Sequence, residues 1–193
     1  MTSTTVRYLP SPHADARPAG VRVDLLVVHA ISLPPGAFGG PFVDDLFLGR
    51  LDPEDHPYFR QLAGLRVSAH FLIDRLGHLT QYVPVLRRAW HAGKSSWLGR
   101  EGCNDFSVGV ELEGVEHGRF TPEQYSCLAG LTRTLMVRLP GITPERIVGH
   151  RDIAPERKWD PGSGFDWEHF RALLRWAPPQ EPDPLVWDET ESA

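Results

Sequence analysis

Residues 23–30 read VDLLVVHA, an almost continuous apolar run that is rich in β-branched side chains. Runs of this length without polar alternation are typical of strands that are buried on both faces of a sheet. We therefore predict a central strand here, with His29 near its carboxyl end.

Three further segments predict strands. Residues 69–73 and 78–83 flank the sequence Asp-Arg-Leu-Gly, which is typical of a hairpin with a glycine-containing turn. Residues 106–113 alternate between apolar and polar positions, so Glu111 and Glu113 share one face of the predicted strand.

Helix signals alternate with these strands along the chain. Pro41 can begin a short helix that carries apolar residues at helical spacing. The stretch Thr121-Pro122-Glu123-Gln124 has the cap, first-turn proline and capping-box glutamine of a longer helix. A short strand over 146–149 leads into an irregular segment, and Asp166 caps a last helix. The pattern predicts a mixed α/β domain.

Length and local composition predict a single domain with two arms. The 193 residues suit one domain of moderate size. Residues 1–21 are rich in Pro, Ser, Thr and Ala and form an N-terminal arm, and 22–176 form the folded unit. Residues 177–193 are acidic and rich in proline, which predicts a disordered tail.

The charge balance and the absence of long apolar runs exclude several classes of protein. The net charge is −5, and the tail alone carries five acidic residues with no Lys or Arg. A nucleic-acid binder would normally show a basic excess. No apolar run reaches the roughly 18 residues of a bilayer-spanning helix, and no secretory signal is seen at the start. We expect no membrane association and a cytoplasmic location.

The segment HRDIAPERKWDPG, residues 150–162, holds the densest group of reactive side chains. His150 and Asp160 from this loop, with His29 from the buried strand, could bind zinc and leave a fourth position for water. Histidines at strand ends also serve as hydrogen-bonded structural residues, and spacing alone leaves both interpretations open.

Two other chemistries deserve comparison with the zinc site. The sequence His-Arg-Asp also occurs in protein kinases, but Arg157 stands where a kinase requires Asn, and no glycine-rich nucleotide loop is present. A Cys–His hydrolase would have to use Cys103 or Cys127, the only cysteines. Cys103 has no local signature and Cys127 lies on the core side of its helix, so we expect two reduced thiols.

Four segments together resemble one enzyme family. LLVVHAISLPPGAFGGP, LRVSAHFLI, RAWHAGKSSWLGREGCNDFSVGVELEG and GHRDIAPERKWDPG are similar, in this order, to the AmpD-type N-acetylmuramoyl-L-alanine amidases, which are cytoplasmic zinc enzymes of peptidoglycan recycling. The resemblance implies the α/β fold that this family shares with peptidoglycan recognition proteins, a single domain with a central mixed sheet flanked by helices. It also implies one zinc ion per chain, with His29, His150 and Asp160 as the ligands, and makes 22–176 the catalytic domain.

The resemblance also assigns the remaining site residues. Strand alternation does not choose between Glu111 and Glu113, but the resemblance implies Glu111 as the general base. Lys158 would be the electrostatic partner, since a cation near the zinc can stabilise the oxyanion of amide hydrolysis. The substrate-binding candidates are Arg66, Trp90 and His91, of which His91 could instead support the metal site.

The implied activity is zinc-dependent cleavage of the amide between N-acetylmuramic acid, preferably its 1,6-anhydro form, and L-alanine. The expected partner is an anhydro-muropeptide substrate, with no nucleic acid, membrane or obligatory protein partner. Ala30 and Gly102 replace Asn and Arg of related sequences, and both changes bear on substrate preference. A non-catalytic peptidoglycan-binding module of the same fold and a lysin-type amidase that acts on intact cell wall are the alternatives.

Overall fold

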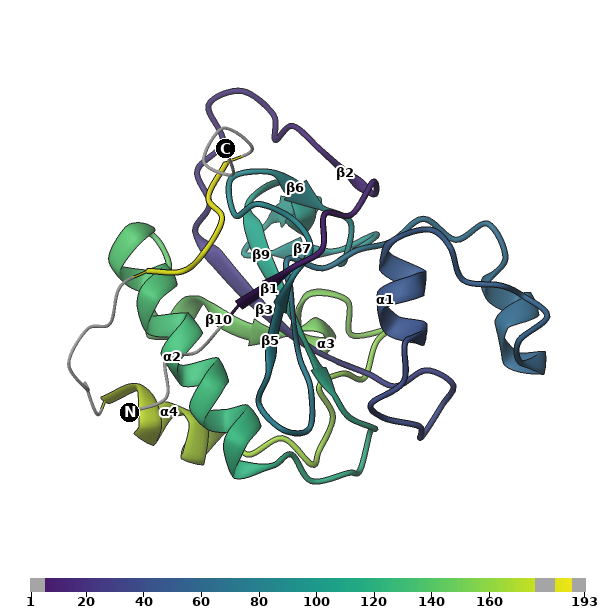
Figure 1. The fold of residues 1–193 in the computed structure, drawn as a ribbon. Helices are drawn as coiled ribbons and strands as arrows, with labels where there is room; N and C mark the ends of the chain where they lie inside the picture. Colours follow the sequence, from purple (N-terminus) through teal and green to yellow (C-terminus); the bar gives the residue numbers. More distant parts are fainter. Residues whose placement is uncertain (1–5, 176–182, 189–193) are drawn as a thin grey trace.

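A computed structural model describes residues 6–175 and 183–188 of the chain (Figure 1). Its largest sheet has six strands in the order β1-β5-β4-β9-β3-β10, and β2 with β6 and β7 with β8 form two small antiparallel pairs. The strands are β1 (Val6–Tyr8), β2 (Ala14–Asp15), β3 (Leu25–Ile31), β4 (Phe71–Ile73), β5 (Leu79–Gln81), β6 (Arg88–Ala89), β7 (Ser96–Trp97), β8 (Arg100–Glu101), β9 (Ser107–Glu113) and β10 (Ile147–Gly149). The α-helices are α1 (Phe42–Phe47), α2 (Pro122–Arg138), α3 (His150–Ile153) and α4 (Trp167–Arg175), with 3-10 turns η1 (Pro57–Leu62), η2 (Cys103–Asp105) and η3 (Pro144–Arg146).

The predicted central strand is confirmed. β3 lies between β9 and β10 and runs parallel to both. Leu26 and Val28 on one face belong to the main core, whereas Leu25 and Val27 on the other face pack in a separate cluster. Because apolar neighbours cover both faces, β3 carries apolar side chains at successive positions without polar alternation.

Helices α2 and α4 cover one face of the sheet (Figure 1). The predicted capping box of α2 is present: the Thr121 hydroxyl accepts the N–H of Gln124, and the Gln124 side chain accepts the N–H of Thr121. Asp166 accepts the N–H of His169 at the start of α4, as the sequence predicts. Leu128, Leu135 and similar buried residues of α2 face the main core. The described helices include none that is both long and apolar enough to cross a bilayer.

The opposite side of the sheet carries α1, which begins after Pro41 as predicted. Val43, Leu46 and Phe47 are the buried residues of this helix, and they share a cluster with Leu72 of β4. The predicted hairpin is also confirmed, since β4 and β5 pair in antiparallel register. The mixed sheet with helices on both faces is therefore the predicted fold.

The N-terminal residues are part of this fold, although the sequence predicts an arm over residues 1–21. β1 adds to the edge of the sheet in parallel with β5, and β2 pairs with β6. The Arg17 guanidinium is partly buried and donates to the carbonyls of Val85, Asn104, Asp105 and Ser107. Residues 6–21 need no core of their own because they complete the core of the main sheet.

The predicted disorder of the tail is wrong for residues 183–188. The carbonyls of Val186 and Trp187 accept the backbone N–H groups of Val85 and Leu86, and the Leu185 and Trp187 side chains are buried. Two apolar side chains within the acidic segment join the main core, and backbone hydrogen bonds hold the segment against it. Residues 177–182 and 189–193 lie outside the described part of the chain.

Candidate metal centre

Three parallel strands bring the central site residues to one edge of the sheet. β3 pairs with β9 so that His29 stands opposite Glu111, and β10 pairs with β3 so that Gly149 stands opposite Val28. His150 directly follows β10. Because the carboxyl ends of parallel strands meet at the same edge, His29 and His150 become neighbours although 121 residues separate them.

The loop after β10 returns to this edge and adds Asp160. The sequence predicts an irregular segment over 150–162, but its first residues form the single-turn helix α3. The N–H of Arg151 in this helix donates to the carbonyl oxygen of Asp160 at 2.9 Å. A Cβ atom on Gly149 would lie 2.7 Å from Cδ of Pro161, so the end of β10 packs tightly against the returning loop. This contact fixes the position of Asp160.

The three ligand candidates converge on one point. His29 Nδ1 lies 2.9 Å from His150 Nδ1, and Asp160 Oδ2 lies 3.1 Å from each of these nitrogens. Donor atoms on one tetrahedral zinc at about 2.0–2.1 Å stand about 3.3 Å apart, so the three atoms need only small shifts to share one ion. The set of two imidazoles and one carboxylate therefore fits zinc.

Hydrogen bonds on the far sides of the rings leave both Nδ1 atoms available. The Nε2–H of His150 donates to the carbonyl of Ala92 at 3.3 Å, and His29 Nε2 lies 2.9 Å from Nδ1 of His91. Burial lowers the pKa of His29 to about 4, so its ring is neutral at pH 7. The site thus combines a neutral His29 ring with a second imidazole and a carboxylate.

Glu111 stands beside this group without belonging to it. Its Oε1 lies 4.0 Å from His29 Nδ1, its Oε2 has no hydrogen-bond partner, and its side chain is 12% exposed. Burial, with a further contribution from the Asp160 charge, raises the pKa of Glu111 well above its usual range. A carboxylate with a raised pKa and a free oxygen can accept a proton and release it again.

Lys158 lies on the loop two residues before Asp160 and is half-buried. Burial and the Asp160 charge raise the pKa of Glu111, whereas the ammonium group of Lys158 lowers it. The charge of Lys158 therefore acts at the same site. Lys158 also lines a cleft of about 380 Å³, together with Glu116, His117, Arg151 and Trp159. The loop therefore places a cation near the ligand group and lines an open cleft with its other residues.

Glu113 has a different environment from Glu111, although the two share a strand face. Its side chain is buried and accepts the backbone N–H groups of Gly39 at 2.7 Å and Arg75 at 3.1 Å. These bonds hold two loops against the end of β9. The second carboxylate of the strand therefore has a structural role.

The three substrate-binding candidates are not brought together around the ligand group. Arg66 is exposed and lies over the Trp90 ring, 5.2 Å from its centroid, and the Trp90 indole N–H donates to Asp15. His91 instead contacts His29. Gly102 has a φ of 69°, a left-handed conformation that favours glycine.

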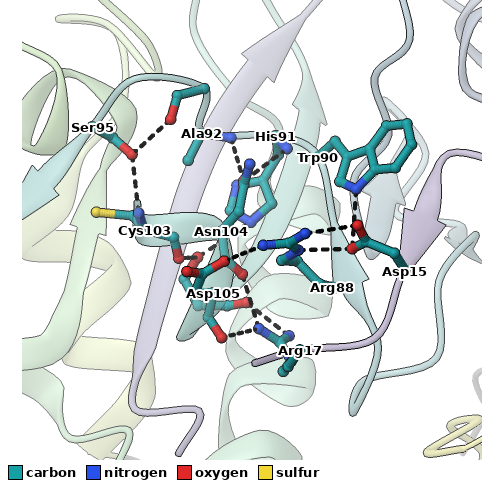
Figure 2. A network of polar contacts seen from close by, with 12 residues as sticks. Asp15, Arg17, Arg88, Trp90, His91, Ala92, Ser95, Cys103, Asn104 and Asp105 are labelled. Atoms are coloured by element: carbon teal, nitrogen blue, oxygen red, sulfur yellow. Dashed lines mark hydrogen bonds and ion pairs between the residues drawn. The ribbon is translucent and has the colours of Figure 1, made fainter. Parts of the chain in front are cut away.

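Sequence reasoning missed the residues that hold the segment after Trp90. The side-chain oxygen of Asn104 accepts the backbone N–H groups of His91 and Ala92 at 3.1 and 2.8 Å (Figure 2). Arg157 donates to the carbonyls of Ala92 and Lys94. Both residues lie within the segments that resemble the amidases, but a polar residue in a loop gives no sign of its distant partner.

The cysteines do not form a second reactive centre. Both are free, and burial raises the pKa of Cys103 and raises that of Cys127 to about 12. Thiols with raised pKa values stay protonated near pH 7 and are weak nucleophiles. This agrees with the prediction of two reduced thiols and argues against a Cys–His hydrolase.

Comparisons with known proteins agree with this arrangement. The family model of N-acetylmuramoyl-L-alanine amidases matches residues 19–163. The 1,6-anhydro-N-acetylmuramyl-L-alanine amidase AmpD of Salmonella typhimurium is 56% identical over 168 residues, which cover 87% of this chain and 89% of the relative. The crystal structure of a selenomethionine AmpD derivative superposes with a TM-score of 0.86 at 56% identity and covers 90% of this chain and 96% of that one.

A more distant solved structure carries a bound substrate. It is the complex of the amidase AmiD from Escherichia coli with anhydro-N-acetylmuramic acid-L-Ala-D-gamma-Glu-L-Lys, at 29% identity and a TM-score of 0.58, and the match covers 81% of this chain and 60% of that one. The family match spans both the central strand with His29 and the loop with Asp160. The chain belongs to the N-acetylmuramoyl-L-alanine amidase family.

Proposed function

We propose that this chain hydrolyses the amide bond between 1,6-anhydro-N-acetylmuramic acid and the L-alanine of a stem peptide, with one zinc ion held by His29, His150 and Asp160. The observation that carries the proposal is the convergence of three ligand atoms within 4.8 Å of one another, all from buried residues. Relatives that are 56% identical over most of the chain are named as amidases of this anhydro substrate.

The proposed division of labour follows from the position of each side chain. When bound, zinc polarises the amide carbonyl and lowers the pKa of a coordinated water to roughly 7. Glu111 accepts the proton of the attacking water, because its carboxylate lies next to the ligand group and has one oxygen without a hydrogen-bond partner. The C–N bond then breaks, and Glu111 returns the proton to the departing amine of L-alanine.

Lys158 supports this reaction through its charge. The amide carbonyl oxygen gains negative charge as water attacks, and an ammonium group on the adjacent loop stabilises that charge in a partly buried site. The cleft of about 380 Å³ beside Lys158 offers room for a part of the substrate. Arg66 and Trp90 stay candidates for contacts with a more remote part of the substrate.

Two alternatives have less support. A non-catalytic binding module needs neither a complete ligand set nor Glu111, yet this chain has both in place. A lysin-type amidase would share the fold, but the substrate named for the 56% identical relatives is an anhydro compound. On the same similarity, we propose a role in peptidoglycan recycling in the cytoplasm.

The scissile bond can be identified by mass spectrometry of the products from an anhydro-muropeptide. We expect a free peptide that begins with alanine together with free anhydro-N-acetylmuramic acid. Treatment with a chelator should abolish both products, and added zinc should restore them. Cleavage at another bond, or release of the free peptide after thorough metal removal, would refute the proposal.

A further inference from the structure

The ring of His91 contacts the proposed zinc ligand His29 at Nε2, away from the other two ligands. From His91, hydrogen bonds lead on to a backbone carbonyl. His29 Nε2 lies 2.9 Å from His91 Nδ1, and His91 Nε2 lies 3.2 Å from the Ser107 hydroxyl oxygen. This hydroxyl lies 2.6 Å from the carbonyl oxygen of Cys103. Four groups thus form a continuous row of three hydrogen bonds.

The last member of the row determines the direction of every bond in it. A carbonyl oxygen can only accept, so the Ser107 hydroxyl donates its single proton to the carbonyl oxygen of Cys103. The same hydroxyl must therefore accept from Nε2–H of His91. A neutral imidazole has one N–H, so Nδ1 of His91 is an acceptor and Nε2 of His29 is the donor. His29 is left with a lone pair on Nδ1, the atom that faces His150 and Asp160.

The surroundings hold His91 in the position that this row requires. A Cβ atom on Gly109 would lie 2.5 Å from Cγ of His91, so the lack of a side chain at this position of β9 makes room for the ring. The side chain of Asn104 accepts the backbone N–H groups of His91 and Ala92 (Figure 2). The Ala92 carbonyl accepts Nε2–H of the second histidine, His150. The segment His91–Ala92, held by Asn104, therefore contacts the rings of both His29 and His150.

We propose that His91 is a positioning residue that fixes the tautomer and the orientation of the metal ligand His29. His91 is itself held by the Ser107 hydroxyl, which donates to the Cys103 carbonyl. This proposal deepens the zinc assignment above and rests on it. It gives His91 a role behind the metal ligand in place of the substrate contact that the sequence suggests. Partners of this kind typically contribute 10- to 100-fold to metal affinity.

The tautomers can be measured without any metal. Long-range proton–nitrogen NMR spectra of the metal-free protein at pH 7.5 distinguish Nδ1–H from Nε2–H imidazoles. We expect the Nε2–H form for both His29 and His91. An Nδ1–H form of either ring would overturn the proposal, and this result would not depend on whether the chain is an amidase.

Variants test whether the row affects metal binding. His91→Phe keeps a ring in the space beside Gly109 but removes the acceptor, so zinc affinity measured by chelator competition should fall 10- to 100-fold. His91→Asn places an amide oxygen near the former Nδ1 and should restore most of the affinity. His78→Phe makes the same exchange at an exposed histidine, whose side chain is 72% exposed, and should leave affinity unchanged.

The melting temperature of each metal-free variant separates a positioning role from a loss of fold. Zinc affinity of His91→Phe equal to wild type would overturn the proposal, as would equal losses in His91→Asn and His91→Phe when both are folded. If His91→Phe does not fold, the comparison of His91→Asn with Ser107→Ala and the tautomers of the wild type decide the question. A wild-type chain that binds no zinc would refute the proposed function, whereas the tautomer measurement would still stand.

Discussion

Replacement of Glu111 by glutamine separates proton transfer from metal binding. Glutamine keeps the volume and shape of the side chain but cannot accept and return a proton. The carboxylate is not one of the three converging atoms, so the variant should keep one zinc ion per chain and its fold. General acid–base catalysis contributes about 100- to 10,000-fold, or about 2.7–5.4 kcal/mol of the barrier, and turnover should fall by that factor.

The environment of Glu111 predicts a second effect of the same change. Burial raises the pKa of this carboxyl above its ordinary value of 4.5, so above that pH the unfolded chain releases the proton more readily than the folded chain. The metal-free wild type therefore loses stability as the pH rises above 4.5. The metal-free Glu111→Gln variant lacks this loss. It should melt at a higher temperature than wild type at pH 7, and the difference should shrink toward pH 4.

The assay compares Glu111→Gln with Glu113→Gln for zinc content, melting temperature and release of free peptide. Glu113 is the next carboxylate on the same strand face and binds two backbone N–H groups, so its variant should retain most of the turnover. Near-normal turnover in Glu111→Gln, or a loss confined to Glu113→Gln, would show that the base is assigned to the wrong carboxylate. Loss of zinc from Glu111→Gln would show that this residue acts as a ligand.

Three further variants test other parts of the account. His150→Ala leaves two ligands, and elemental analysis after dialysis should find no stoichiometric zinc; retention of one ion would remove His150 from the ligand set. Glu113→Ala removes the acceptor of two hydrogen bonds, from the N–H groups of Gly39 and Arg75, each worth about 0.5–1.5 kcal/mol, and should lower the free energy of unfolding by about 1–3 kcal/mol in denaturant titrations, with turnover retained. Thr121→Ala removes half of the capping box that begins α2 and should cost about 1 kcal/mol of stability, seen as a melting temperature about 2–4 °C lower. An unchanged melting temperature would contradict the role of the cap.

Elements whose signals are local could be predicted from the sequence. The capping box that starts at Thr121 and the apolar run before His29 each carry their information within a few neighbouring residues. The pairing of β3 with β9 and β10 is not local. It follows from the packing of both faces of the sheet, which a pattern along the chain does not specify.

Residues whose partners are distant could not be assigned in advance. Arg17 lies in a stretch rich in proline and alanine, and its acceptors begin 68 residues further along the chain. Its partly buried position follows only from the way the chain returns beside β9. His91 was consistent with a metal-supporting residue or a substrate contact, and only the 2.9 Å distance to His29 favours the first.

The most direct test of the central claim is a zinc titration of the metal-free protein, with release of free peptide from an anhydro-muropeptide as the readout. A single site formed by His29, His150 and Asp160 predicts that activity rises in proportion to added zinc and levels off at one equivalent per chain. Full activity before any zinc is added, or a plateau only at two equivalents, would contradict the claim.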